Sequence, residues 1–311
     1  MKDYPRIVFM GTPEIAAHIL TGLLNENYRV IGVIAQEDKP IGRKKIVEPV
    51  PTKKVALEKN IPVFQPRRIR LDYEFVRELQ PDLIVTCAYG QIIPQELIDI
   101  PRLGCINVHG SLLPKYRGAS PIQQALISGD RITGVTILEM TAKMDAGKML
   151  YKKEIAVAED ENYTSLYQKI ASLGLQALLE MLPDYVAGKI AGEVQDESLV
   201  STCKKISKEE EHLSLNYSCK EFVGYVKGLS YSPGGYLLYG TEVFKILRAE
   251  IVNARVDGEV GQVVSMDKNG MILQLKDGQV SLLEVQRQGK KRMNAADFIN
   301  GNKQMYRALL K

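Results

Sequence analysis

Tryptophan is absent from this chain of 311 residues, and histidine and cysteine are scarce, with three and four copies. The cysteines (Cys87, Cys105, Cys203 and Cys219) stand far apart and include no C-x-x-C pair, so the spacing of a zinc site is lacking. Cys87 and Cys105 lie inside apolar runs, where a thiol typically acts as a small buried hydrophobic group. We therefore expect no bound metal, reduced thiols and a cytoplasmic location.

Long apolar runs are also missing. No stretch approaches the roughly 20 apolar residues that cross a bilayer, and residues 1–5 carry no apolar signal-peptide core. The net charge of +4 is too small to indicate a polyanionic partner unless the charge is clustered. The length suggests two domains, each able to bury its own core. We expect no membrane partner, and a monomer, although the sequence carries no direct signal of oligomeric state.

Three common motifs of nucleotide and ester chemistry are absent. A strand leading into Gly11-Thr12-Pro13-Glu14 looks like the start of a nucleotide-binding domain, but the G-x-G-x-x-G spacing does not follow. Neither G-x-x-x-x-G-K-[ST] nor G-x-S-x-G occurs. The usual evidence for dinucleotide binding, a P-loop NTPase or an α/β-hydrolase is therefore lacking.

The first half of the chain alternates short apolar runs with segments of helical periodicity. This alternation predicts an α/β domain with a Rossmann-like, mostly parallel sheet. We expect strands at residues 6–10, 30–35, 82–86, 105–108 and 133–140, and helices at 15–24, 72–79, 122–128 and 164–182. The last helix is expected to end at Pro183 and Gly188.

The second half has a different texture. A charged stretch near residues 191–206 predicts a linker, and five short β-like runs follow it, at residues 236–239, 243–247, 261–265, 271–275 and 280–283. They predict a smaller OB-like β-barrel domain. The expected organisation is a catalytic domain over 1–190, a linker over 191–206 and the barrel over 207–311.

Two polar side chains stand at the end of the predicted strand over 105–108. Successive residues of a strand alternate between faces, so Asn107 and His109 point to the same side, at the carboxyl edge where open α/β sheets bind ligands. An amide N–H can stabilise an oxyanion, and an imidazole can transfer protons near neutral pH. The pair suits acyl transfer or hydrolysis, but a lone histidine is more often structural, and the residues alone leave both interpretations open.

An acidic residue follows the next predicted strand. Asp145 lies in a loop after the strand over 133–140, and from there a carboxylate could enter the same crevice and orient the imidazole. The sequence Asp145-Ala146-Gly147 is equally typical of an ordinary turn. The spacing therefore does not decide whether Asp145 meets Asn107 and His109.

These motifs together resemble the folate-dependent formyltransferases, over essentially the whole chain. The matching pieces are residues 6–14, residues 105–114 with Arg117-Gly118, residues 145–147 and residues 194–197. The run Asn-x-His-x-Ser-Leu-Leu-Pro with a downstream Asp is highly specific for this superfamily, but it does not identify the acceptor.

The resemblance implies that 10-formyltetrahydrofolate donates a formyl group to an amine and is consumed as a cosubstrate, without a metal. It puts Asn107, His109 and Asp145 at the family's catalytic positions. It puts the folate along Ser111, Leu112, Leu113 and Pro114, and along the backbone of residues 89–91. Without the resemblance, plain packing would be the favoured role of Leu112 and Leu113.

A long basic loop bears on the acceptor. Residues 39–54 contain six Lys and Arg residues against one Glu, and the loop is too long for an ordinary βα connection. Such a density of cations suits RNA phosphates, although a solvated charge run is the plainer alternative. The formyltransferases that act on methionyl initiator tRNA carry a basic insertion at this place, which implies contacts from Arg43, Lys44 and Lys45. The glycine usual between that Arg and the Lys pair is missing here.

Two classes of alternative remain open at this point. The same catalytic residues would serve a formyltransferase with a small acceptor, such as a nucleotide sugar or a purine precursor, or a hydrolase that gives the formyl group to water. A small acceptor would not need the basic loop or the barrel. A non-catalytic RNA-binding protein on an enzyme scaffold is a different class, and intact Asn107, His109 and Asp145 argue against it.

Overall fold

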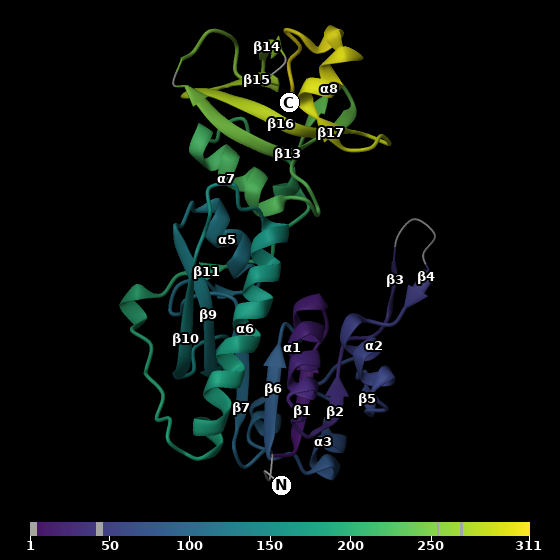
Figure 1. The fold of residues 1–311 in the computed structure, drawn as a ribbon, viewed down its shortest axis with the longest axis vertical. Coiled ribbons are helices and arrows are strands. Elements are labelled where there is room, and N and C mark those ends of the chain that lie inside the picture. Colours follow the sequence, from purple (N-terminus) through teal and green to yellow (C-terminus); the bar gives the residue numbers. More distant parts are fainter. Residues whose placement is uncertain (1–4, 42–45, 254, 268–269) are drawn as a thin grey trace. The chain divides into compact units, whose positions relative to one another are not determined.

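The computed structural model describes residues 5–41, 46–253, 255–267 and 270–311. The chain divides into two compact units. The N-terminal unit comprises residues 1–118, 133–155 and 167–202, and the C-terminal unit comprises residues 119–132, 156–166 and 203–311. Figure 1 labels their elements in chain order. Among the described residues, no helix is long and apolar enough to cross a membrane.

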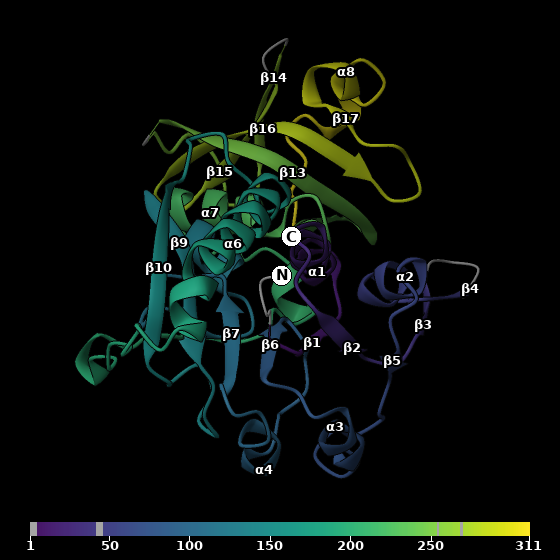
Figure 2. The ribbon, with the colours of Figure 1, turned by 60° about the horizontal axis from the view of Figure 1, so that its bottom comes forward.

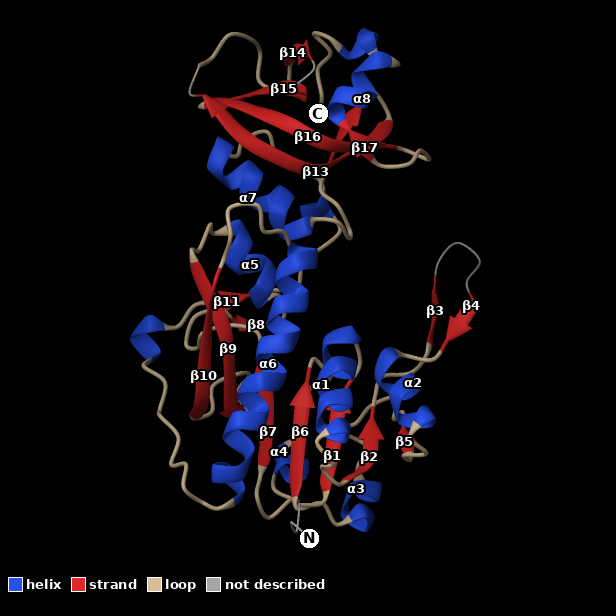
Figure 3. Cartoon of the chain, viewed as in Figure 1, coloured by secondary structure: helices blue, strands red, loops and turns tan. Residues whose placement is uncertain are grey.

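The N-terminal unit is built on a seven-stranded sheet, which Figure 3 draws in red. Its order is β10 (Met149–Ala156), β9 (Ile132–Glu139), β7 (Cys105–His109), β6 (Leu83–Cys87), β1 (Ile7–Gly11), β2 (Val30–Ile34) and β5 (Val63–Phe64). The strands from β7 to β5 are parallel, and β9 runs antiparallel to β7. The prediction of a Rossmann-like, mostly parallel sheet is confirmed.

Helices cover both faces of this sheet (Figure 2). Val8, Met10 and Cys105 pack toward α3 (Glu74–Leu79) and α4 (Gln95–Ile98). On the other face lie α1 (Glu14–Asn25) and α6 (Tyr163–Val186). Val108 packs closely on α6, since a Cβ added to Gly174 of this helix would lie 3.0 Å from Val108 Cγ1. Because side chains alternate along β7, Asn107 and His109 share the face of Cys105.

The predicted strands of this unit match the observed ones to within one residue at each end. The prediction for α6 was wrong at its end, because the helix continues through Pro183 to Val186. A proline in the last turn of a helix removes one hydrogen bond without preventing that turn, and Gly188, at φ +69°, follows the helix. The strand β10 and the helix α2 (Pro51–Glu58) were not predicted.

Two short strand pairs lie outside the seven-stranded sheet. One is the hairpin of β3 (Lys39–Ile41) and β4 (Ile46–Glu48), and the other pairs β8 (Arg117–Gly118) with β11 (Thr202–Cys203). The short 3-10 helix η1 (Glu197–Leu199) precedes β11.

The C-terminal unit contains an antiparallel sheet. Its order is β12 (Tyr236–Tyr239), β13 (Glu242–Asn253), β16 (Gly278–Arg287), β15 (Gly270–Leu275) and β14 (Val263–Asp267), with β17 (Met293–Asn294) on β16. The helices α5 (Pro121–Ile127), α7 (Cys219–Leu229) and α8 (Ala295–Asn300) and the 3-10 helices η2 (Glu209–Glu211) and η3 (Lys303–Met305) belong to the same unit. The helix α7 was not predicted.

The last described segment closes this sheet into a barrel. Val263 N donates to Ala308 O at 2.9 Å, and Leu310 N donates to Gly261 O at 2.8 Å. Lys311 N donates to Leu238 O at 2.9 Å. Residues 307–311 therefore pair with both edge strands, β14 and β12, and the OB-like barrel predicted for this region is confirmed.

Candidate active site

The amide of Asn107 is oriented by the neighbouring strand. Thr86 lies beside Asn107 in the register of β6 and β7, and its hydroxyl donates to Asn107 Oδ1 at 2.8 Å. A hydroxyl can donate to an amide only at the oxygen, so the Nδ2 end turns away from Thr86. Among the described residues, no hydrogen bond uses Asn107 Nδ2, which leaves this donor for a ligand.

His109 is buried, with 5% of its surface exposed, and both ring nitrogens face oxygen atoms. Nε2 lies 2.9 Å from the main-chain oxygen of Tyr116, and Nδ1 lies 3.7 Å from Asp145 Oδ2. A carbonyl oxygen only accepts hydrogen bonds, so Nε2 carries a proton. Nδ1 faces the Asp145 carboxylate, so the imidazole lies between a carbonyl oxygen and a carboxylate oxygen.

Asp145 enters the site from the loop that joins β9 to β10. Its Oδ2 accepts a hydrogen bond from Gly118 N at 2.8 Å, and its backbone has φ +50°, in the left-handed region. The next glycine, Gly147, packs so tightly that a Cβ there would lie 1.8 Å from Glu139 O. The structure thus brings His109 and Asp145 together, with Asn107 on the same face of β7.

Two buried side chains outside the predicted site hold this loop. Gln195 Nε2 donates to Asp145 O at 2.7 Å and to Gly147 O at 2.8 Å. Arg117 Nε donates to Gln195 Oε1 at 2.9 Å. Both Gln195 and Arg117 are 5% exposed. The sequence pointed to residues 117 and 194–197 only as pieces of the resemblance, because contacts across 50 and 78 residues leave no periodic signal.

Arg117 has a second, exposed partner. Its Nη2 donates to Glu197 Oε1 at 2.9 Å, and Lys143 Nζ lies 3.2 Å from Glu197 Oε2. Hydrogen bonds from Arg117 and then from Lys143 hold the pKa of the Glu197 carboxyl below its ordinary value.

The segment predicted for folate begins two residues after His109. The Ser111 hydroxyl donates to Lys115 O at 2.6 Å, and Thr136 Oγ1 donates to Ser111 O at 2.7 Å. Leu113 is buried against Leu138 and Met149, whereas Leu112 and Pro114 are half-buried. The side chain of Leu113 therefore belongs to the core, so a ligand here would meet the main chain and the two half-buried residues.

Some polar groups of the second predicted folate segment, residues 89–91, already form hydrogen bonds within the chain. Tyr89 O accepts hydrogen bonds from Thr12 Oγ1 and Gln36 Nε2, both at 3.1 Å. The side chain of Gln91 contacts the backbone of Ile69 and Pro66. The Tyr89 carbonyl thus already accepts two hydrogen bonds within the chain, and the contact of folate with the backbone of residues 89–91 stays a prediction.

The basic residues predicted to contact RNA, Arg43, Lys44 and Lys45, lie outside the described residues. They fall between β3 and β4, where Ile46 and Val47 at the start of β4 are exposed. The predicted long loop is thus a hairpin, with Lys39 paired to Glu48 in its register.

An ionic cluster fixes the base of this hairpin. Lys53 Nζ forms an ion pair with Asp38 and donates to Gln65 Oε1 at 2.7 Å, while Gln65 Nε2 and Val50 N donate to Asp38 Oδ1. Although burial raises the pKa of Asp38, the hydrogen bonds of Lys53, Gln65 and Val50 together lower it below its ordinary value. Lys54 pairs with Glu48 at 3.1 Å, so two of the six cations of this loop already have carboxylate partners.

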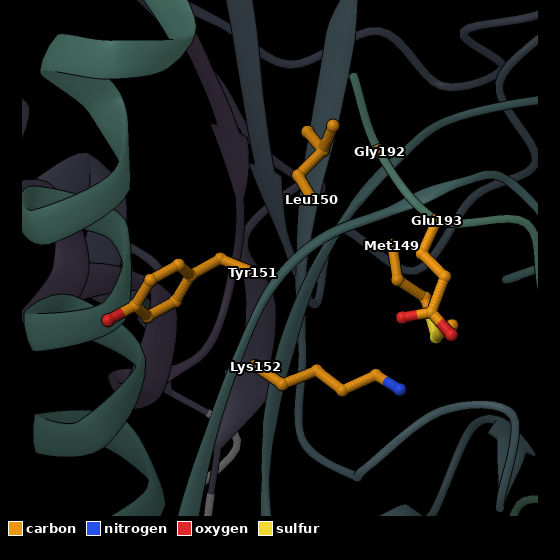
Figure 4. A pocket seen from close by; sticks show the side chains of 6 residues that line it. All are labelled: Met149, Leu150, Tyr151, Lys152, Gly192 and Glu193. Carbon is orange, nitrogen blue, oxygen red and sulfur yellow. The ribbon is translucent and has the colours of Figure 1, made fainter. Parts of the chain in front are cut away.

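A separate hollow of about 370 Å³ lies on β10 (Figure 4). It is lined by Met149, Leu150, Tyr151, Lys152, Gly192 and Glu193. Met149 and Glu193 exchange two backbone hydrogen bonds of 2.8 Å. None of the predicted catalytic residues lines this hollow, so we assign it no part in the chemistry.

Comparisons with known proteins agree on one family. The Formyl transferase family matches residues 5–182, and the family described as Formyl transferase, C-terminal domain, matches residues 205–303. A protein of Bacillus subtilis named methionyl-tRNA formyltransferase is 42% identical over 95% of this chain and 94% of its own. The protein of the same name from Mesoplasma florum is 40% identical over 94% of each chain.

Solved structures show the same fold at lower identity. The methionyl-tRNA formyltransferase of Clostridium thermocellum has a TM-score of 0.56 and 16% identity, covering 81% of this chain and 95% of its own. HypX from Aquifex aeolicus, in complex with tetrahydrofolic acid, has a TM-score of 0.65 and 17% identity, and covers 96% of this chain. This chain spans 47% of the HypX chain.

Proposed function

The chain belongs to the formyl transferase family, and on this premise we propose that it transfers the formyl group of 10-formyltetrahydrofolate to the amino group of methionyl initiator tRNA. The observation that carries the proposal is the meeting of His109 and Asp145 beside Asn107 at the end of β7. The name of the relatives that match this chain almost end to end supports the acceptor.

The reaction replaces one C–N bond of the formyl group by another. The acceptor amine attacks the formyl carbon, and the carbonyl electrons move onto oxygen to form a tetrahedral oxyanion. When the oxyanion collapses, the bond to N10 of the folate breaks. The amine loses one proton and N10 gains one, so the reaction needs proton transfer but no redox step.

The three polar residues divide this work. The unused Nδ2 donor of Asn107 stabilises the oxyanion, as a preorganised amide does in acyl transfer. His109, protonated between Tyr116 O and the Asp145 carboxylate, adds positive charge beside the oxyanion. Asp145 holds the imidazole and accepts the amine proton, directly or through a water molecule.

The two substrates approach different parts of the N-terminal unit. The folate lies along Ser111, Leu112, Leu113 and Pro114, and contacts mainly the backbone, since Leu113 is a core residue. The tRNA phosphates contact Arg43, Lys44 and Lys45, which lie between β3 and β4 in the sequence. The chain acts as a monomer in the cytoplasm, a reducing compartment suited to its four buried cysteines, none of which forms a disulfide bond.

The test is transfer of labelled formyl from 10-formyltetrahydrofolate to purified methionyl initiator tRNA. Elongator methionyl-tRNA, free methionine, a nucleotide amino sugar and water serve as parallel acceptors. We expect selective labelling of the initiator tRNA. Labelling of the sugar, or release of formate, would replace the tRNA by a small acceptor or by water, and labelling of nothing would refute formyl transfer.

A further inference from the structure

Three consecutive residues, Tyr116 to Gly118, touch both titratable residues of the site. Tyr116 O accepts from His109 Nε2, and Gly118 N donates to Asp145 Oδ2. The side chain of Arg117, between them, is buried and donates to Gln195. One short segment therefore sets where the imidazole and the carboxylate stand relative to each other.

The chain returns to this segment after α6. Ser201 Oγ accepts from Tyr116 N at 2.9 Å, and Ser201 O accepts from Arg117 N at 2.9 Å. Gln195, six residues earlier, contacts the Asp145 loop and Arg117 at once. Residues 195–201 thus contact both residues 116–118 and the Asp145 loop, all within the N-terminal unit.

Resting on the proposed function, we propose that Gln195 is a positioning residue, which, clamped by Arg117, sets the Asp145 carboxylate against His109. Both ends of its amide group are hydrogen-bonded: Nε2 donates to two carbonyl oxygens, of Asp145 and Gly147, and Oε1 accepts from Arg117. The guanidinium fixes which end of the amide faces the loop, because only Oε1 can accept from Arg117.

The backbone of the loop explains why such a clamp is needed. A residue with a side chain disfavours the left-handed conformation that Asp145 adopts at φ +50°. The two hydrogen bonds from Gln195 bracket this residue at its own carbonyl and at that of Gly147, and so oppose its relaxation. Without them the carboxylate would leave Nδ1 of His109, while the groups predicted to bind folate would be untouched.

The substitution Gln195→Leu tests this role, because it keeps the approximate size of the side chain and removes all three hydrogen bonds. We expect kcat to fall about 10- to 100-fold, the usual cost of displacing a catalytic group by about an ångström, with both KM values unchanged within about twofold. Gln274 provides a matched control. It is a buried glutamine of the C-terminal unit whose Nε2 likewise contacts carbonyl oxygens, of Leu275 and Gly278 and, at 3.4 Å, of Arg255. Gln274→Leu is expected to lower the melting temperature without lowering kcat of the folded enzyme.

A second readout does not depend on activity. The chain has three histidines, so selective ¹⁵N labelling of histidine gives ring signals from His18, His109 and His212 alone. In Gln195→Leu we expect the His109 signals to shift, because the Asp145 carboxylate moves away from the ring, while those of His18 and His212 stay in place. Gln274→Leu is expected to leave the His109 signals unchanged.

The outcomes separate this proposal from the proposed function. A wild-type protein that formylates no acceptor refutes the function, but the His109 signals still test the clamp. Wild-type kcat and unchanged His109 signals in Gln195→Leu refute the positioning role and leave the function standing. If Gln195→Leu does not fold, Gln195→Asn, which keeps the amide but is one methylene shorter, takes its place with the same expected results.

Discussion

The loop that carries Asp145 and the hairpin of β3 and β4 both connect elements of the N-terminal unit, but different contacts fix them. The loop is fixed by Gln195 and by close packing of Gly147 on β9. The hairpin is fixed at its base, by the Asp38 cluster, while Ile46 and Val47 remain exposed. The difference separates a loop held by buried hydrogen bonds from a hairpin held only at its base, where we propose that the tRNA binds.

The energies of the two arrangements differ accordingly. An unpaired polar group left in a buried network costs about 1–3 kcal/mol, and the neighbours of the network move with it. An exposed ion pair such as that of Lys54 and Glu48 contributes about 0–1 kcal/mol. Substitutions in the Asp145 loop should therefore change kcat, and substitutions in the hairpin should change the affinity for tRNA.

The largest loss of kcat is expected for substitutions of Asn107 and His109, the polar residues at the end of β7. Asn107→Ala and His109→Ala remove the proposed oxyanion donor and the imidazole proposed to act beside it, and each should lower kcat about 100- to 1000-fold. Binding of tRNA, measured by filter retention, should be unchanged. A normal kcat in either variant would move the chemistry away from the end of β7.

Gly147→Ala should come next. Its Cβ would meet Glu139 O, a backbone atom that cannot turn aside, so the loop must shift and kcat should fall about 10- to 100-fold. Gly301→Ala is the matched control, because an added Cβ there meets nothing within 4 Å. Equal activity of the two variants would show that the loop tolerates displacement, and that its rigidity has no part in the reaction.

Charge reversal between β3 and β4 should change KM for tRNA and leave kcat unchanged. Lys44→Glu and Lys45→Glu should each raise KM for tRNA about 10-fold at low salt, with less effect at high salt, because contacts to phosphates depend on counterion release. The KM for 10-formyltetrahydrofolate and kcat should stay constant. A rise in KM for the folate instead would remove the separation between loop and hairpin.

The smallest effect is expected at the base of the hairpin. Asp38→Asn should raise KM for tRNA about two- to threefold and lower the free energy of unfolding by about 0.5–1 kcal/mol at neutral pH. Because the pKa of Asp38 is lowered in the folded state, its contribution is present above the ordinary carboxyl pKa of about 3.9 and is lost as the pH falls through the lower folded value.

Thermal unfolding of wild type and Asp38→Asn between pH 3 and 7, followed by circular dichroism, measures this difference. The two melting temperatures should approach each other toward pH 3. A constant gap across the range would mean that the charge of Asp38 contributes no stability.

Much of the sheet and part of the site follow from local patterns. Apolar runs bounded by turns mark the strands of the N-terminal unit, and the two-residue period of a strand puts Asn107 and His109 on one face. The end of α6 was harder to predict, because Pro183 is compatible with a last turn. The hairpin was missed, since a three-residue strand such as β4 is too short to show a period.

The hydrogen bonds that Gln195 makes to the Asp145 loop could not be predicted from local patterns, for another reason. Gln195 stands in an irregular segment, and its partners Asp145 and Arg117 are 50 and 78 residues away in sequence. Nothing in the spacing of a single glutamine predicts that it is buried, or that it contacts two carbonyl oxygens. Contacts of this kind become visible only once the sheet brings distant loops to one edge.

The segment at residues 307–311 also bears on how the barrel is made. It supplies the hydrogen bonds between β14 and β12, and its Leu310 is buried in the core of that unit. On the ribosome, the strands from residue 236 onward emerge first, and their two outer edges stay unpaired until this segment leaves the exit tunnel. Open strand edges invite pairing with other chains, so the barrel is open to aggregation until this segment pairs with both edges.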